Sequence, residues 1–274
     1  MKTFHLILLL TSLSFVFGCK KKGCTDLKAE NYNRFATEDD GSCKFNDYSL
    51  SPSVVTYYIP RFNDNSGTLL AIDEGRIYET NKMGTIFTWY FECLAHFDEI
   101  GNTYSINCGE LKTFLKYPNS NSLLSLIFKV TEQNFYHLPG GFIIGMPNKF
   151  PDTLKYVATG DEWPAFTLET TLKFPSINGI TVGDIIPSTP YKISMGHVSA
   201  DSIAVQMFGK NGSLLKLLPG NETSCEFSSQ EVNTLGKGTA YLAITTLKYE
   251  TQTVDSRLYH IVNGRRVVKQ IFSY

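Results

Sequence analysis

Apolar and polar residues alternate in short runs from residue 48 onward, and turn-forming residues separate the runs. The runs are rich in Val, Ile, Thr, Tyr and Phe, which suit a pleated sheet with a buried face. Many short strands at regular spacing favour an all-β chain built from β-sandwiches. We predict strands at 54–59, 68–72, 85–91, 122–130, 142–146, 166–174, 202–208, 240–247 and 258–262.

Two Asn-Gly pairs, at 211–212 and 263–264, lie between strand-like runs. Asn-Gly readily adopts the positive φ angles of a type I′ turn, so we predict a β-hairpin at each pair. Helical periodicity is rare in this chain. One short helix is expected over 228–235, because Ser228 and Glu231 have the spacing of a capping box.

A proline-rich stretch at 186–190 reads Ile-Pro-Ser-Thr-Pro. Proline is rarely found inside a central strand, so this stretch predicts a domain boundary. We therefore expect two β-sandwich domains. The first covers 45–186, and the second, over 187–274, has the size of an immunoglobulin-like domain.

An apolar run at 6–17 follows the basic residue Lys2. The run is shorter than the roughly 20 residues that a membrane-spanning helix needs, and its length suits a secretory signal peptide. Its end, V-F-G-C at 16–19, resembles the lipobox of bacterial lipoproteins. This resemblance implies a signal peptide at 1–18 and acylation of Cys19, with membrane lipid as a partner. An ordinary signal peptide followed by an unmodified cysteine is the alternative.

Three lysines, Lys20, Lys21 and Lys22, follow this cysteine and would make 19–23 a short basic tether. Several acyl chains anchor a protein stably, and nearby basic residues favour anionic headgroups. The whole arrangement resembles an outer-membrane lipoprotein of the Gram-negative envelope. Some lineages mark surface export by acidic residues directly after this cysteine, where the present chain has lysines. Both a periplasmic and a cell-surface orientation therefore stay open.

The segment 24–43 follows the pattern C-T-D-x-x-A-x-N-Y-N-x-x-A-x-x-D-D-G-S-C. It resembles a small module of secreted and surface proteins of Gram-negative bacteria, and is loosely similar to the calcium repeats of thrombospondin type 3. The resemblance implies a disulfide between Cys24 and Cys43 and a disulfide-stapled acidic module over 24–44. A loop with so few apolar residues needs a disulfide or a metal to keep one shape.

Five side chains of this module offer the hard oxygen ligands that Ca²⁺ prefers. They are Asp26, Asn31, Asn33, Asp39 and Asp40. The spacing of an EF-hand loop is absent, because Ala36 stands where the first ligand is needed. Calcium is therefore a candidate cofactor, and the alternative is a turn whose acidic side chains are simply hydrated.

A second pair of cysteines, Cys93 and Cys108, lies symmetrically about Ile100 and Gly101. A hairpin turning there would place the two cysteines directly across from each other, close enough for a strained cross-strand disulfide. Two unpaired, half-buried thiols are the alternative. Cys225 has no partner left, and we expect it to be a buried free thiol.

The chain has 25 Lys and Arg residues against 26 Asp and Glu residues, which excludes the basic surplus of a nucleic-acid binder. It contains no nucleophile elbow, zinc-protease motif, P-loop or dinucleotide fingerprint. Trp163 follows Asp161 and Glu162 in a loop-like context and is a candidate for stacking on a sugar ring. The alternative is that Trp163 packs back onto the sandwich.

Residues 85–274 also resemble the body of bacterial envelope lipoproteins built from β-sandwich domains. The resemblance rests on Phe87, Phe97 and the stretches 104–107, 163–167 and 201–205. We predict a non-catalytic binding or assembly module of the cell envelope, with an envelope protein or a glycan as partner. The alternatives are a carbohydrate-binding surface lipoprotein, a secreted hydrolase with a site assembled in space, and a structural surface-coat component.

Overall fold

The structure is a computed structural model, and it describes residues 20–25, 31–43, 56–62, 65–80, 84–99, 105–118, 123–131, 134–137, 150–186 and 189–273. The signal peptide, Cys19, Asp26 and the strand predicted at 142–146 lie outside these residues. The chain divides into two compact units, 1–48 with residue 274, and 49–273. We call the second unit the β body. Its described residues form several sheets and one short helix, which confirms the all-β prediction.

The first unit contains the predicted disulfide between Cys24 and Cys43, whose Cα atoms are 4.6 Å apart. The lysine segment runs alongside the module instead of forming a separate tether. The backbone N–H of Thr37 donates to the carbonyl of Lys21 at 2.8 Å, and the N–H of Gly23 donates to the carbonyl of Glu38 at 3.1 Å. The described residues 20–23 therefore belong to the folded module.

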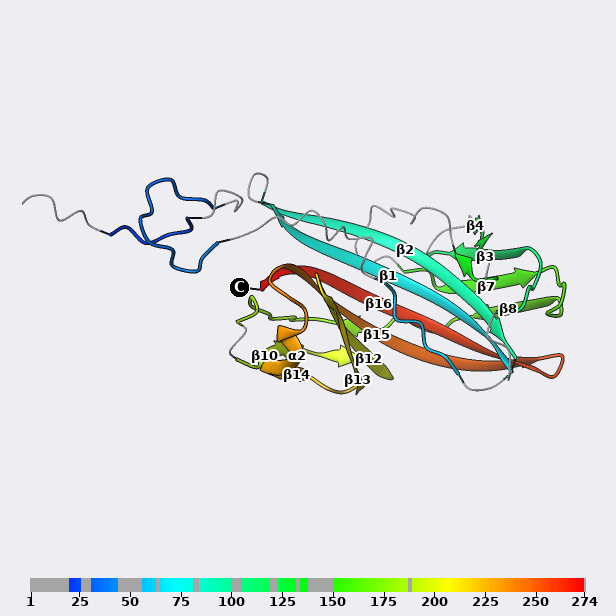
Figure 1. Cartoon of the computed structure of the whole chain (residues 1–274). Helices are drawn as coiled ribbons and strands as arrows, with labels where there is room; N and C mark the ends of the chain where they lie inside the picture. Colours follow the sequence, from blue (N-terminus) through cyan, green and yellow to red (C-terminus); the bar gives the residue numbers. More distant parts are fainter. Residues whose placement is uncertain are drawn as a thin grey trace, which may run out of the picture. The chain divides into compact units, whose positions relative to one another are not determined.

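An eight-stranded sheet forms the centre of the β body, in the order β13-β12-β15-β16-β1-β2-β6-β5 (Figure 1). The pairing of β1 with β16 is parallel, and the other pairings in this sheet are antiparallel. The strands are β1 (Ser66–Thr80), β2 (Gly84–Asp98), β5 (Lys129–Val130), β6 (Tyr136–His137), β12 (Ser202–Gly209), β13 (Gly212–Pro219), β15 (Gly238–Val254) and β16 (Arg257–Ser273).

Three smaller sheets accompany the large one. Their orders are β4-β3-β7-β8, β10-β14 and β11-β9. Their strands are β3 (Leu111–Lys116), β4 (Leu123–Ile127), β7 (Thr153–Ala158), β8 (Phe166–Thr170), β9 (Ser176–Ile177), β10 (Tyr191–Ser194), β11 (Val198–Ser199) and β14 (Ser224–Phe227).

Two apolar clusters lie along one face of the large sheet. In the first, the four-stranded sheet packs on β1, β2 and the first half of β16, through residues such as Leu69, Leu115 and Tyr156. In the second, the two small sheets and the helix pack on β12, β15 and the end of β16, through residues such as Ile193 and Val205. The two predicted sandwiches therefore exist as two packing layers on one shared sheet.

The predicted boundary at 186–187 needs correction for this reason. It would separate β1 from β16, whose residues pair from Ser66 with Leu258 to Ile77 with Lys269. Of the stretch, the described Pro190 precedes β10 and lies outside any strand, where no ladder hydrogen bond is required. The proline-rich stretch is thus a connection inside the β body.

The opposite face of the large sheet is partly covered by residues 56–62, which run without strand structure where the strand 54–59 was predicted. Tyr57, Ile59 and Phe62 pack against a cluster that includes Leu70 and Val262. The apolar residues at 57–59 reflect this packing on a sheet face, since such packing needs apolar side chains but no ladder.

One of the two predicted hairpins forms, but its two-residue turn is 210–211, and Asn211 lacks the positive φ that a type I′ Asn-Gly turn needs. β12 and β13 form a hairpin, with Gly209 opposite Gly212. The other prediction is wrong, because Asn263 and Gly264 lie inside β16. A Cβ atom on Gly264 would come within 3.0 Å of a Leu247 methyl group, so the glycine serves close packing between strands.

The chain instead turns between β15 and β16 at Asp255 and Ser256, both with positive φ, of 47° and 67°. The helix α2 (Ser229–Asn233) confirms the predicted capping box. The hydroxyl of Ser228 accepts from the N–H of Glu231, whose carboxylate accepts from the N–H of Ser228. In the described part of the chain, no helix has the length and apolar character needed to cross a membrane.

Candidate functional sites

Trp163 has no exposed surface, so it cannot stack on a sugar, and that prediction is wrong. Its indole N–H donates to the Tyr259 hydroxyl at 3.1 Å, and its ring centroid is 5.3 Å from that of Phe97. The Arg257 guanidinium lies 4.6 Å from the indole ring. Because the loop folds back onto the sheet, Trp163 closes one end of the first cluster, as the alternative interpretation expected.

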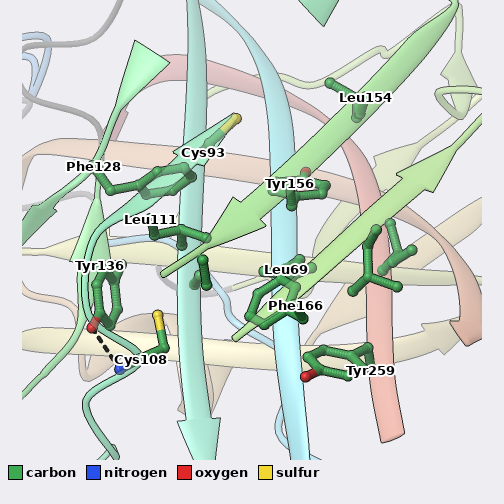
Figure 2. Packing of buried hydrophobic residues seen from close by; sticks show 14 of the residues in the cluster. Leu69, Cys93, Cys108, Leu111, Phe128, Tyr136, Leu154, Tyr156, Phe166 and Tyr259 are labelled. Carbon is green, nitrogen blue, oxygen red and sulfur yellow. Dashed lines mark hydrogen bonds between the residues drawn. The ribbon is translucent and has the colours of Figure 1, made fainter. Parts of the chain in front are cut away.

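Cys93 and Cys108 are both buried and are not bonded to each other, so the predicted cross-strand disulfide is not formed. β6, and not the chain that follows the predicted turn, pairs with β2 beside Cys93, with His137 opposite Leu94. Cys108 instead lies near Tyr136, whose hydroxyl accepts from the Cys108 N–H at 2.8 Å. Figure 2 shows the two thiols in different parts of the first cluster.

Burial raises the pKa of the Cys93 thiol well above its usual value, and that of the Cys108 thiol to about 11. Cys225 is also buried and free, as predicted, and burial raises its pKa. Thiolate is the reactive form of cysteine, so these thiols are poor nucleophiles near neutral pH. They act as small apolar side chains of the interior.

Three of the five residues predicted to bind calcium use their side-chain oxygens within turns of the module. The Asp39 carboxylate accepts from the Gly41 N–H, and the Asp40 carboxylate accepts from the Ser42 N–H, both at 3.0 Å. Hydrogen bonds from Ser42 lower the pKa of Asp40. The Asn33 amide oxygen accepts from the Phe35 N–H.

The structure therefore places Asn33, Asp39 and Asp40 in local turns, while the amide nitrogen of Asn31 donates to the Ser42 carbonyl. Within the described ranges, no three His, Cys, Asp or Glu side chains are grouped as a metal would require. Calcium binding stays a prediction.

A buried charged cluster, which the sequence did not reveal, lies under residues 56–62. Glu74 of β1 and Arg266 of β16 stand opposite each other, and both are fully buried. Their charged groups are 3.3 Å apart, and Arg76 also pairs with Glu74. The Arg266 guanidinium donates to the carbonyl of Thr56 at 2.8 Å, so it fastens this segment to the sheet.

Glu92 extends this cluster on β2. Burial, followed by the charge of Glu74, raises the pKa of Glu92 to about 7, although Arg76 opposes the shift. Two neighbouring carboxylates, one with a pKa near 7, are what general acid–base catalysis requires. Glu74, however, is fully buried, so a substrate cannot contact it in this conformation. The described geometry supports a structural role for the pair.

The strand β13 lies at one edge of the large sheet. Among the described strands it pairs with β12 alone, so its other backbone edge carries no ladder. Leu215 and Leu217 are 48% and 56% exposed. On the other side of the strand, Leu214 and Leu218 pack against the second cluster. One face of β13 thus packs against the second cluster, and the other exposes apolar side chains to solvent.

Comparison with known proteins gives little. No protein-family model and no curated protein matches the chain. One similar solved structure is the tetra-tandem repeat in the extending region of a large adhesion protein, with 12% identity and a TM-score of 0.23. The match covers 73% of this chain and 48% of that structure, so the chain spans about half of its length. Similarity this low carries no functional argument.

Proposed function

We propose that this chain is a lipid-anchored protein of the outer membrane that serves as a non-catalytic assembly module of the cell envelope. The lipobox resemblance at Cys19 supports the anchor. The disulfide between Cys24 and Cys43 supports an oxidising compartment, because such bonds persist outside the reducing cytosol. The acylated cysteine would directly precede the folded module.

The open edge of β13 is the observation that carries the assembly role. An edge strand presents a row of backbone N–H and C=O groups, which an extended segment of another protein can complete. Leu215 and Leu217 would give that segment an apolar surface on one face of the sheet. We expect the partner to be an envelope protein that adds a strand beside β13. The glycan alternative has lost Trp163, the residue on which it rested.

Site-specific photocrosslinking in cells tests the assembly role. A photoreactive residue at Leu217 should yield a reproducible adduct, whereas the same residue at Thr253, an exposed position within β15, should yield none. The substitutions Leu215→Lys and Leu217→Lys, with a crosslinker at Ser213, should remove the adduct. Equal adducts at Leu217 and Thr253, or none at either, would overturn the role assigned to β13.

The anchor is tested separately by fractionation. The wild-type chain should sediment with membranes, and Cys19→Ala should move it toward the soluble fraction. Metabolic labelling with a palmitate analogue should mark only the wild-type chain. An unlabelled wild-type chain would contradict the lipid anchor.

A further inference from the structure

An exposed aromatic ring stands on a tight turn of the module. The N–H of Ala36 donates to the carbonyl of Asn33 at 2.8 Å, which closes a turn with Arg34 and Phe35 at its corners. The Asn33 side chain accepts from the Phe35 N–H at 3.0 Å and fixes the turn further. Phe35 is nevertheless 59% exposed. Two hydrogen bonds therefore stabilise a turn that exposes an apolar ring to solvent.

Cationic groups surround this ring. The Arg34 guanidinium lies 4.5 Å from the Phe35 centroid, and the Lys21 ammonium lies 5.3 Å from it. The neighbouring Lys20 is 80% exposed and has only a long ion pair, of 3.9 Å, to Glu38. We call Phe35, Arg34, Lys21 and Lys20 the Phe35 patch. It combines an apolar centre with a positively charged surround.

The patch lies close to the predicted lipid anchor along the chain. The Lys21 backbone is bound to the module, because its carbonyl accepts from Thr37 and its N–H donates to the Thr37 hydroxyl at 3.0 Å. One residue, Lys20, separates Lys21 from Cys19, and an extended chain spans at most about 3.6 Å per residue. An acylated Cys19 would therefore keep the Lys21 backbone within roughly 7 Å of the anchored residue, and the rest of the patch beside it.

We propose that the Phe35 patch is a second membrane contact, which binds the anionic headgroup layer of the bilayer. This inference rests on the proposed lipid anchor for its location. Aromatic rings are favoured at the membrane–water interface, and basic side chains beside an anchor are attracted to anionic lipids. Lipid therefore suits both the apolar centre and the charged surround of the patch.

The acidic residues of the module do not remove this complementarity. The carboxylates of Asp39 and Asp40 accept hydrogen bonds from Gly41 and Ser42, so they belong to a different turn from Phe35. Glu38 engages Lys20 and leaves Lys21 and Arg34 beside the ring. The contact would orient the module against the bilayer, which flexible acyl chains alone cannot do.

Vesicle sedimentation tests the patch without the lipid anchor. A chain of residues 20–274 lacks both Cys19 and the apolar run at 6–17, so neither contributes to binding. It should bind vesicles of phosphatidylcholine with 30% phosphatidylglycerol, and bind pure phosphatidylcholine far more weakly. Arg34→Gln and Lys21→Gln should each weaken binding about fivefold, the effect of one basic residue near an anionic surface. Phe35→Ser should also weaken it.

Lys192→Gln is the matched control, because Lys192 is a similarly exposed lysine, 75% exposed, on the β body. It should leave vesicle binding unchanged. Equal losses for Lys192→Gln and Arg34→Gln, or no preference for phosphatidylglycerol, would overturn the patch. The anchor is judged independently, by the fractionation of wild-type chain and Cys19→Ala in cells. Failure of either proposal is therefore visible by itself.

Discussion

The module and the β body keep their structures by opposite means. The module has a disulfide, exposes Phe35, and among its described residues buries little more than Cys24 and Gly23. The β body contains three free cysteines within clusters of buried apolar side chains. A short segment cannot bury enough apolar area to offset its conformational entropy, whereas a large sheet covered by smaller ones can.

This contrast teaches that compartment alone does not decide how a cysteine is used. All of these cysteines would share one oxidising environment, yet only Cys24 and Cys43 are bonded. In the β body, β6 separates Cys93 from the chain that could have brought Cys108 opposite. In the β body, which has an apolar core, the free cysteines fill space among other side chains. In the module, whose described residues form no such core, the disulfide holds the fold together.

The largest effect is expected from the interior of the β body. Trp163→Ala should lower the free energy of unfolding by about 3–5 kcal/mol, because it removes a fully buried indole and leaves a cavity. Urea unfolding followed by circular dichroism measures this loss. Trp163→Phe is the control and should cost less than half as much, since an aromatic ring still fills most of the site, although the hydrogen bond to Tyr259 and part of the indole volume are lost. A loss below 1 kcal/mol for Trp163→Ala would contradict the role of this core.

The disulfide should matter to the module alone. Cys24→Ser with Cys43→Ser should destabilise the module by about 3 kcal/mol, the chain-entropy estimate for a closed loop of this size. Backbone NMR shifts of residues 31–43 should then collapse toward random-coil values, while the urea midpoint of the β body stays unchanged. A shift in that midpoint would show that the two units are energetically coupled.

The pH dependence of the two regions should have opposite signs. The pKa of Glu92 is raised to about 7, so its ionisation between pH 4.5 and 7 opposes folding, and the β body loses stability as the pH rises through this window. Glu92→Gln should remove that loss and stabilise the β body at pH 8 by about 1–2 kcal/mol, because Glu92 keeps partial contact with solvent. Urea midpoints at pH 5 and pH 8 measure this.

The module provides the opposite case. The pKa of Asp40 is lowered by hydrogen bonds from Ser42, so its contribution is present at neutral pH and disappears as the pH falls below 4. Asp40→Asn should flatten the acid limb of the module's NMR-detected unfolding and leave that of the β body unaltered. Parallel pH profiles for the two regions would contradict this difference.

The smallest effect is expected from the buried thiols. In the native protein at pH 8, Cys93, Cys108 and Cys225 should resist alkylation, because each is buried with a raised pKa. Mass spectrometry should find all three alkylated once urea is added, without a reductant. A disulfide-linked Cys93–Cys108 peptide in place of two alkylated thiols would contradict the claim that only the module uses a disulfide.

Local sequence patterns predicted the parts of the fold that local physics determines. The alternating runs at 68–72, 202–208, 240–247 and 258–262 all lie within strands, and Ser228 and Glu231 cap α2 as expected. Pairing between distant segments left no such pattern. The contact of β1 with β16 therefore stayed hidden, and the proline-rich stretch was mistaken for a domain boundary.

The candidate sites were harder to predict because residue type alone does not indicate exposure. Trp163 follows two acidic residues and looked exposed, yet its loop folds back onto Tyr259. Nothing in the local sequence around Glu74 and Arg266 marks them as partners, and only the β1–β16 register shows that they neutralise each other inside the protein. Asn263 and Gly264 formed a plausible turn, but tertiary packing overrode their local preference.

The parallel pairing of β1 with β16 also determines the order in which the large sheet can fold. The β1–β2 hairpin can form early. The second neighbour of β1 is β16, so residues such as Thr68 gain their partner, His260, only when β16 has been added. Contacts between such distant residues form slowly, because a long loop must close first. A ribosome or a translocation channel releases a polypeptide gradually, so β1 would emerge before β16 and the large sheet would be incomplete. Chaperones that shield unpaired strands would be needed until residues 257–273 have been released.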